Sequence, residues 1–342
     1  MPQALFLHAA GDARVEPYAP PPPGPGETRV RVAAVGLCGS DLHYFKDGGI
    51  GAAQVRAPFV PGHEIAAWLT GDLPGAGLRK GALVAVDPNV ACGTCDWCRK
   101  GWHNLCPHVR FIGAPPYDGA MATEMNVPVG QILPLPEGFT PARTAMLEPL
   151  GVAIHALDLA RPHLGERATV LGCGPVGLLV VQLLRLAGAG EVLAIDPQPH
   201  RRALAARLGA TRVAAGLAEA ADWNGGEGSP LVVEFTNARE GFAEAVAAAR
   251  IGGRLVLGGI PDGDSYVLPA APARRRGLGV KFVRRMGDDY PRAMALVAAG
   301  RIDVDSLVSH RLPLAEGPAA FRRHAEGAAD VVKTVLYPNG VC

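Results

Sequence analysis

Short runs of apolar and polar residues, interrupted by glycine and proline, fill the first third of the chain. Residues 4–7 and 28–32 have the pattern of short strands, and residues 83–86 form another apolar run of strand length. A proline tract over residues 20–25 excludes helix between the first two. This pattern predicts an irregular β-rich domain. Near the C-terminus, residues 307–310 and 332–336 predict strands that complete the same domain.

The pattern changes near residue 168, where a short apolar run predicts a buried strand that ends at residue 172. Residues 178–186 are apolar on nearly every face, as expected for a helix packed on a sheet. Further strands are predicted at 191–195, near 212–213, and at 231–235, 254–259 and 280–283. Alanine-rich helical segments separate these strands. About six parallel strands of this kind make an α/β fold with a doubly wound sheet.

Length and composition restrict the class of protein. A chain of 342 residues is long for one hydrophobic core, so two domains are expected. With a net charge of +1, the chain offers no electrostatic basis for binding nucleic acid or an anionic membrane. The N-terminus lacks the basic start of a signal peptide, and no run of about 18 apolar residues occurs. We therefore expect a cytoplasmic protein with neither membrane nor nucleic-acid partners.

A stretch from residue 36 to residue 64 collects side chains that bind metals. Cys38 lies between glycines, Ser40 and His43 follow it, and a Pro-Gly turn leads into His63 and Glu64. Thiolate, imidazole and carboxylate are the ligand types that catalytic zinc takes, with a fourth position left for water or substrate. Taken alone, the stretch is also compatible with a buried cysteine and a polar turn.

A second cluster, of four among the seven cysteines, lies in one loop: Cys92, Cys95, Cys98 and Cys106. Their spacing permits a closed tetrahedral metal site, which would be structural because it has no open position. Free thiols, an iron–sulfur cluster and a nucleic-acid zinc knuckle are the alternatives, and the last lacks the basic surface it needs. The dense spacing favours a metal site in a reducing compartment over a disulfide framework.

The segments GLCGSDLHYF and PGHE, together with the four-cysteine loop, resemble the zinc-containing medium-chain dehydrogenase/reductase family. The nearest branch is the polyol dehydrogenases, which act on sorbitol, xylitol or L-idonate. The resemblance implies a GroES-like β-rich catalytic domain over residues 1–147 and a Rossmann NAD-binding domain over 148–283. Residues 284–342 would then return to the catalytic domain. The four-cysteine loop would hold a structural zinc.

Residue by residue, the resemblance implies that Cys38, His63 and Glu64 bind the catalytic zinc. Ser40 and His43 would relay the proton of the substrate hydroxyl, and two aromatic side chains would line the substrate pocket, Tyr44 and Phe111. The chain departs from the family at Ala67, where glycine is usual, and at the Trp68 that follows. The family's backbone path is therefore not carried over to residues 68–78.

Two charged residues later in the chain have both a plain and a functional interpretation. Glu148 interrupts an apolar run, as an acid in the first turn of a helix does. The resemblance implies instead a carboxylate that faces the zinc, bound directly or through water. Arg285 is either half of an exposed arginine pair or, by the resemblance, a residue that reaches substrate and cofactor. Met286 replaces the tyrosine that usually follows it. His155 is expected to be a packed helix residue.

A G-x-G-x-x-G motif follows the strand at 168–172 and opens a helix, with an acid, Asp196, at the end of the next strand. Gly172 permits the tight turn, Gly174 admits the pyrophosphate, and Gly177 lets helix and strand pack closely. Asp196 favours NAD over NADP, because it binds the ribose hydroxyls and repels a 2′-phosphate. The expected cofactor-binding residues are Gly172, Gly174, Pro175, Val176, Gly177, Asp196, Arg201, Gly259 and Ile260.

Together these features predict a zinc- and NAD-dependent enzyme that reversibly oxidises a secondary hydroxyl of a polyol or sugar acid to a ketone. A threonine or simple secondary-alcohol dehydrogenase of the same family is the first alternative. A non-catalytic nucleotide-binding protein is the alternative from another class, although such proteins tend to lose zinc ligands. The family also implies a homo-oligomer, a dimer or a tetramer.

Overall fold

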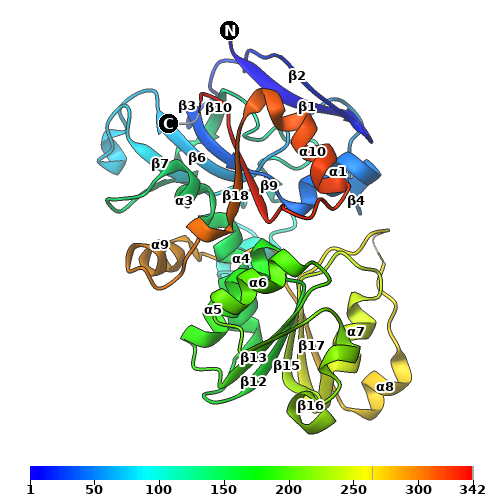
Figure 1. The fold of residues 1–342 in the computed structure, drawn as a ribbon. Coiled ribbons are helices and arrows are strands. Elements are labelled where there is room, and N and C mark those ends of the chain that lie inside the picture. The colour runs from blue at the N-terminus through cyan, green and yellow to red at the C-terminus, as the bar shows by residue number, and fades with distance from the viewer. Residues whose placement is uncertain (264, 341–342) are drawn as a thin grey trace. The chain divides into compact units, whose positions relative to one another are not determined.

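The computed structural model describes residues 1–263 and 265–340, and the chain folds into two compact units (Figure 1). Unit 1 comprises Met1–Glu148, Tyr290–Ala298 and the segment from Val304 onward. Unit 2 comprises Pro149–Asp289 and Ala299–Asp303. No helix in the described ranges has both the length and the apolar composition needed to cross a bilayer.

The main sheet of unit 1 has the strand order β11-β7-β6-β3-β19-β18, and β10 also pairs with β3. Neighbouring strands are antiparallel except β18 and β19. The strands are β3 (Glu27–Gly36), β6 (Glu64–Leu69), β7 (Leu83–Val86), β10 (Glu124–Pro128), β11 (Ile132–Pro134), β18 (Val308–Pro313) and β19 (Lys333–Tyr337). The strands predicted from the C-terminal end are thus confirmed as β18 and β19 of this sheet.

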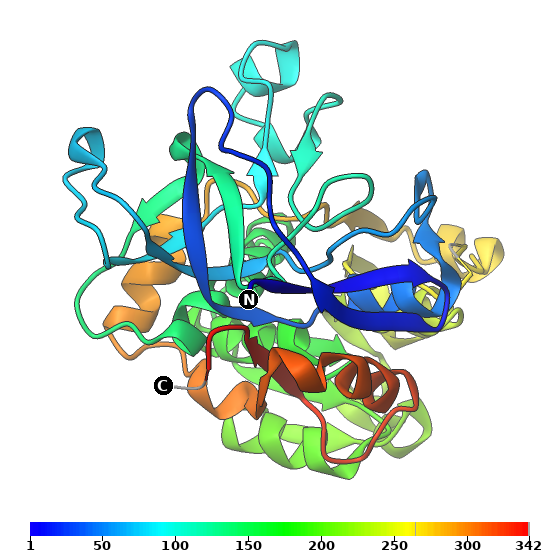
Figure 2. The same ribbon diagram turned by 90° about the horizontal axis from the view of Figure 1, so that it is seen from above.

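Three two-stranded pieces complete the strands described in unit 1: β1 (Gln3–Ala9) with β2 (Asp12–Pro17), β4 (Gly49–Ile50) with β5 (Ala53–Gln54), and β8 (Asn89–Val90) with β9 (Arg110–Phe111). Its helices are α1 (Gly39–Asp47), α2 (Asp96–Arg99), α3 (Pro141–Ala145), α9 (Tyr290–Ala298) and α10 (Gly317–Ala325). Figure 2 shows the β1–β2 hairpin, in blue, beside the orange-red α10, which packs on β2.

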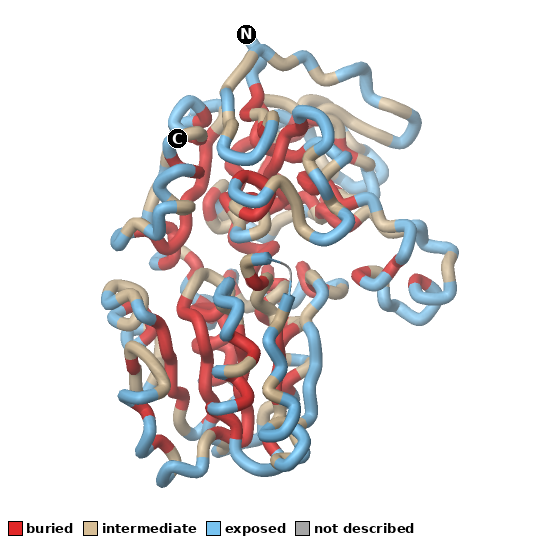
Figure 3. Tube along the Cα trace, turned by 90° about the vertical axis from the view of Figure 1, so that its right-hand side faces the viewer, coloured by how far each residue is buried: buried red, intermediate tan, exposed pale blue. Residues whose placement is uncertain are grey.

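Ala67, which stands where the family usually has a glycine, belongs to the core of unit 1. Ala67 is fully buried inside β6, where it pairs with Val32 on one side and Val84 on the other. Trp68 follows with Arg31 over its ring, at 4.8 Å from the ring centre. Strand β6 therefore runs on to Leu69, and the chain then turns. Figure 3 shows the buried segments of the chain in red and the exposed segments in pale blue.

Unit 2 contains a parallel sheet with the strand order β14-β13-β12-β15-β16-β17. This is the doubly wound order, in which the first strand, β12, lies next to both the second and the fourth. The strands are β12 (Arg167–Leu171), β13 (Glu191–Ile195), β14 (Arg212–Ala214), β15 (Ser229–Glu234), β16 (Ala249–Leu257) and β17 (Gly279–Phe282). The predicted parallel sheet is confirmed, and β16 begins five residues earlier than its apolar run suggested.

Helices of unit 2 pack on neighbouring strands, with α5 on β12 and β13, α6 on β13 and β14, and α7 on β15 and β16. They are α5 (Pro175–Leu186), α6 (Pro199–Arg207), α7 (Gly241–Ala248) and α8 (Ala270–Arg275), while α4 (Leu147–Ala160) begins in unit 1. His155 lies within α4, as expected. The short 3-10 turns of the chain are η1 (Pro74–Ala76), η2 (His103–Leu105), η3 (Val129–Gln131), η4 (Leu217–Ala220), η5 (Trp223–Gly226), η6 (Asp305–Leu307) and η7 (Leu314–Glu316).

Candidate metal and nucleotide sites

Cys38, His63 and Glu64 lie together in unit 1, with ligand atoms all within 4.8 Å of one another. Two antiparallel neighbours bring them there, because β3 ends two residues before Cys38 and β6 begins at Glu64, which pairs with Gly36. A Cβ atom at Gly36 would lie 1.7 Å from Glu64 Oε2. Any side chain at Gly36 would therefore displace the Glu64 carboxylate from this position.

The buried atoms of this cluster fit a bound cation. Glu64 Oε2 and His63 Nδ1 are buried and have no hydrogen-bond partner, and the same is true of Asp41 Oδ1. Leaving such groups unsatisfied costs about 1–3 kcal/mol each. Burial disfavours a charged His63, yet Asp41 and Cys38 hold its pKa well above the usual range. A site that draws a proton this strongly carries excess negative charge, and a thiolate, an imidazole and a carboxylate are the ligands that zinc prefers.

Two positioning residues that the sequence analysis did not single out support these ligands. Asp41 Oδ2 accepts a hydrogen bond from the Cys38 backbone N at 2.9 Å, and Asp41 Oδ1 lies 3.7 Å from His63 Nδ1. Lys333 Nζ donates to Glu64 Oε1 and, at 3.0 Å, to the Leu37 carbonyl. A helix-start pattern signals Asp41, and a lysine inside an apolar strand signals Lys333.

Glu148 lies in the first turn of α4, 4% exposed, and stays outside the group of ligand atoms within 4.8 Å of one another. Burial raises its pKa to about 7, the charge of Glu64 adds to that, and the charge of His63 opposes it. Glu148 is therefore a buried carboxyl group that interacts electrostatically with His63 and Glu64. Direct or water-mediated binding of zinc by this group stays a prediction.

The remaining predicted residues of unit 1 lie on α1 and β9. His43 is buried, with Nδ1 at 2.9 Å from Asp47 Oδ2, and Ser40 is half-buried three residues before it. The Phe111 ring lies against His63, with the ring centres 5.4 Å apart. The ring of Tyr44 is buried against Phe59. The structure thus places Phe111 beside His63, one of the candidate metal ligands, while Tyr44 contacts the core.

The four cysteines of the predicted structural site converge, with all Sγ atoms within 4.8 Å of one another. The Sγ–Sγ separations are 3.5 Å for Cys95–Cys98, 3.9 Å for Cys95–Cys106 and 3.9 Å for Cys92–Cys98. A tetrahedron with Zn–S bonds of 2.3 Å has edges of about 3.8 Å. The spacing of the four sulfur atoms therefore fits a site for one zinc ion. An iron–sulfur cluster would need room for its inorganic sulfides as well.

The glycine motif of unit 2 has the geometry that a dinucleotide requires. Gly172 has a positive φ of 85°, and a Cβ at Gly177 would lie 1.9 Å from the Gly172 carbonyl oxygen. A Cβ at Gly174 would meet no described heavy atom within 4 Å, so the backbone there is open to a ligand. Gly174 caps α5, with Pro175 as its first residue and Val176 next, so the positive end of the helix faces this opening.

Asp196 lies at the carboxyl end of β13, 3% exposed. Its Oδ2 accepts from Cys173 N and its Oδ1 from Gln198 N, each at 2.8 Å, which fixes the carboxylate beside the glycine turn. Arg201 Nη1 lies 3.9 Å from Asp196 Oδ2. Further along the sheet edge, Gly259 and Ile260 follow β16.

Arg285 follows β17 and has a positive φ of 56°. The next residue, Met286, is 3% exposed and packs so closely on Gly151 that a Cβ there would lie 2.3 Å from its Sδ. Met286 thus packs in the core of unit 2. The contact of Arg285 with substrate stays a prediction.

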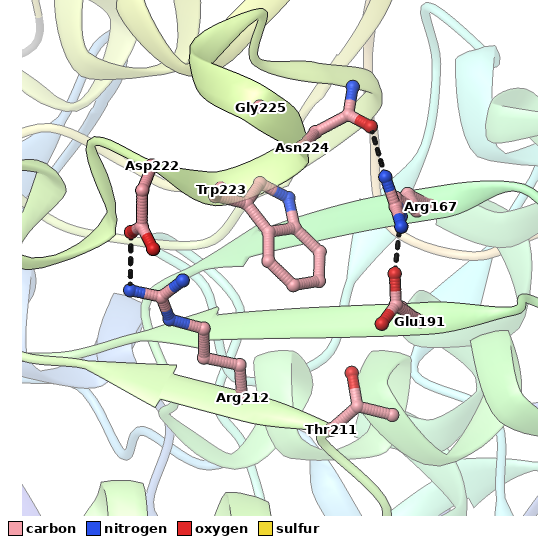
Figure 4. Close-up of a pocket in the computed structure, with 8 residues that line it drawn as sticks. All are labelled: Arg167, Glu191, Thr211, Arg212, Asp222, Trp223, Asn224 and Gly225. Carbon is pink, nitrogen blue, oxygen red and sulfur yellow. Dashed lines mark hydrogen bonds and ion pairs between the residues drawn. The ribbon is translucent and has the colours of Figure 1, made fainter.

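A hollow of about 410 Å³ lies at the opposite, amino end of β12, β13 and β14 (Figure 4). Its charged side chains pair with their neighbours: Arg167 with Glu191 and Asn224, and Arg212 with Asp222. Trp223 lies between the two arginines. Since these groups satisfy each other, we assign no ligand to this hollow.

Comparison with known proteins agrees with both sites. Residues 24–137 match the alcohol dehydrogenase GroES-like domain, and residues 175–299 match the zinc-binding dehydrogenase domain. The chain is 34% identical to sorbitol dehydrogenase of Gallus gallus, over 96% of each protein. Among solved structures, a putative zinc-binding dehydrogenase from Sinorhizobium meliloti bound to NADP is 32% identical with a TM-score of 0.87, over 99% of each chain. L-idonate 5-dehydrogenase from Escherichia coli is 25% identical with a TM-score of 0.87, over 98% of each chain.

The first family match includes both predicted zinc sites, and the second begins inside the glycine motif, at Pro175. The chain belongs to the zinc-containing medium-chain dehydrogenase/reductase family, in its polyol dehydrogenase branch.

Proposed function

We propose that this protein is a zinc-dependent dehydrogenase that uses NAD to oxidise a secondary hydroxyl of a polyol or sugar acid to a ketone, reversibly. The observation that carries the proposal is the cluster of Cys38, His63 and Glu64, in which His63 and Glu64 are buried with unpartnered polar atoms. The same chain has an open glycine motif. Relatives that act on sorbitol and L-idonate support the substrate class.

The roles of the side chains follow from their chemistry. When bound, zinc supplies Lewis-acid polarisation of the substrate oxygen, and the nicotinamide accepts the hydride. Cys38, His63 and Glu64 hold the metal, and Glu148 tunes the charge beside it. Ser40 and His43, three residues apart on α1, relay the hydroxyl proton, and Asp47 orients the His43 ring through Nδ1. The substrate pocket is shaped by Phe111, Tyr44 and Arg285.

We assign the catalytic role to residues 1–147 and 284–342 and the cofactor role to residues 148–283, the four-cysteine loop holding a structural zinc. Asp196 supports NAD over NADP, because its fixed carboxylate repels a 2′-phosphate. The relative from Sinorhizobium meliloti is bound to NADP, so both cofactors belong in the assay. The four cysteines of the loop gather as a candidate metal site and not in disulfides, which supports a reducing, cytoplasmic compartment.

An exposed sheet edge supports the expected homo-oligomer. Strand β17 ends the sheet order of unit 2, and all four of its residues are exposed, Phe282 by 60%. An edge strand with apolar side chains is a template for pairing with another chain. Light scattering on the purified protein measures its molar mass in solution. A monomer at all concentrations would contradict the expected homo-oligomer.

The activity test follows NADH absorbance with sorbitol, xylitol, L-idonate, L-threonine and ethanol, each with NAD and with NADP. The proposal expects turnover with a polyol or sugar acid. Preference for L-threonine or ethanol would instead favour the alternative within the family. Cys38→Ser is expected to abolish turnover while NADH still binds. A fully active Cys38→Ser enzyme would refute the metal role, and a zinc-loaded protein that binds NADH without turnover would favour a non-catalytic nucleotide-binding protein.

A further inference from the structure

Glu234 is a buried carboxylate at the carboxyl end of β15 to which the proposed chemistry gives no role. It is 1% exposed. Its Oε1 accepts hydrogen bonds from Thr236 N at 2.7 Å and Thr236 Oγ1 at 2.5 Å, and its Oε2 accepts from Gly259 N at 3.3 Å. Burial raises the pKa of Glu234, and these donors oppose the rise. Burial of a carboxyl group costs free energy, so a compensating role for Glu234 is expected.

The hydrogen bonds of Glu234 join two loops at the same edge of the sheet, residues 235–240 after β15 and residues 258–262 after β16. The contact is close, since a Cβ at Gly259 would lie 2.0 Å from the Thr236 carbonyl oxygen and 2.7 Å from Glu234 Oε1. Gly259 N also shares its hydrogen with the Glu234 carbonyl oxygen, at 3.2 Å. Both loops therefore contact this one side chain, and a backbone hydrogen bond from Asp262 N to the Asn237 carbonyl oxygen, at 2.9 Å, also joins them.

The strand order tells which half of a dinucleotide these loops face. The glycine motif follows β12, and Asp196, which would hold the adenosine ribose, directly follows β13. In the order β14-β13-β12-β15-β16-β17 the adenosine half therefore lies on the β13 side. The other half extends over the ends of β15 and β16, where Glu234 joins the two loops.

We propose that Glu234 is a positioning residue that holds the loops after β15 and β16 in place for the nicotinamide half of the cofactor. This inference rests on the proposed function, because it assumes a nicotinamide dinucleotide at this edge. It assigns Glu234 no contact with the reacting atoms.

Glu234→Gln tests the proposal in the zinc-loaded full-length enzyme. An amide has a single acceptor oxygen, which Thr236 occupies, so the amide NH₂ would face Gly259 N–H and release that loop. Calorimetry is expected to show about a tenfold rise in the NADH dissociation constant, as for a lost hydrogen bond to a charged group. Binding of ADP, which contains only the adenosine half, is expected to stay unchanged.

Glu191→Gln is the matched control, because Glu191 lies at the opposite end of the same sheet, in the ion pair with Arg167. It is expected to leave the binding of both ligands unchanged. Thr236→Val removes one donor to Glu234 without changing a charge, and it is expected to weaken NADH binding in the same direction by about threefold. This variant decides the matter if Glu234→Gln does not fold.

Equal weakening of NADH and ADP would show a general loss of structure and overturn the proposal, and so would unchanged NADH binding in both variants. Failure of the wild-type enzyme to bind NADH at all would refute the proposed function itself. The two failures are thus distinguishable.

Discussion

Replacing Lys333 by methionine tests the charge arrangement at the candidate catalytic metal site. Lys333 is 2% exposed and Glu64 is fully buried, and the ammonium group donates to Glu64 and to the Leu37 carbonyl. Burial alone would lower the pKa of Lys333, but Glu64 and Cys38 keep it above its ordinary value. The lysine is therefore charged, and its removal leaves a buried carboxylate without a counter-ion.

Breaking a buried ion pair by removing one partner costs about 3–5 kcal/mol. For a domain of roughly 150–250 residues, each kcal/mol lowers the Tm by about 2–4 °C. We therefore expect Lys333→Met to lower the Tm of the metal-free protein by about 6–20 °C. With zinc bound, a second cation faces Glu64, so the loss is expected to be smaller.

Differential scanning calorimetry of chelator-treated and zinc-loaded samples measures both values. Lys80→Met, at an exposed lysine of the same unit, is the control and is expected to change the Tm little. Adding Glu64→Gln to Lys333→Met removes the stranded charge and is expected to recover part of the loss. Equal Tm values for Lys333→Met and the wild type in the metal-free state would refute the electrostatic account of the site.

Three further predictions concern other parts of the molecule. The pKa of Glu148 rises from its ordinary 4.5 to about 7 in the folded state, so metal-free wild type loses stability as pH rises through this window. Glu148→Gln abolishes that dependence and is more stable above pH 7 by up to about 3 kcal/mol, checked by urea unfolding at several pH values. Cys98→Ser is expected to lower the zinc content by one equivalent per chain, measured by atomic emission, with NADH binding retained. Asp196→Ala is expected to raise the ratio of kcat/KM for NADP over NAD by about tenfold or more, because Arg201 then faces the 2′-phosphate without a competing acid.

Local patterns made several features predictable. The residues Cys38, His63 and Glu64 belong to short segments with characteristic spacing, and adjacent strands bring these segments together. The strand predicted at 83–86 has its observed bounds, because its apolar run is short and stops at Asp87 and Pro88. Asp41 was within reach of the same reasoning, since its bond to Cys38 is a helix-start pattern.

Other features depend on contacts between distant segments. Lys333 pairs with Glu64, which is 269 positions away in the sequence. The hydrophobic pattern of neither segment predicts this pair. Strand β16 begins at Ala249 because β15 offers a partner there, although the residues after Ala249 are exposed and the run is not apolar. The two-residue strands β8 and β9 exist only as partners of each other. Tertiary pairing decides such elements, so local sequence does not predict them.

The charges around the candidate catalytic site lead to one requirement. For His63 and Lys333, burial favours loss of a proton, yet the pKa of each is raised by neighbouring acids and Cys38. Negative charge therefore outweighs desolvation at two side chains that come from opposite ends of the chain. Of the two Glu64 carboxylate oxygens, Lys333 donates only to Oε1, so Oε2 is buried without a hydrogen-bond partner. An excess of negative charge therefore remains at the site. A divalent cation held by Cys38, His63 and Glu64 would offset this excess of negative charge, which a proton on His63 alone does not do.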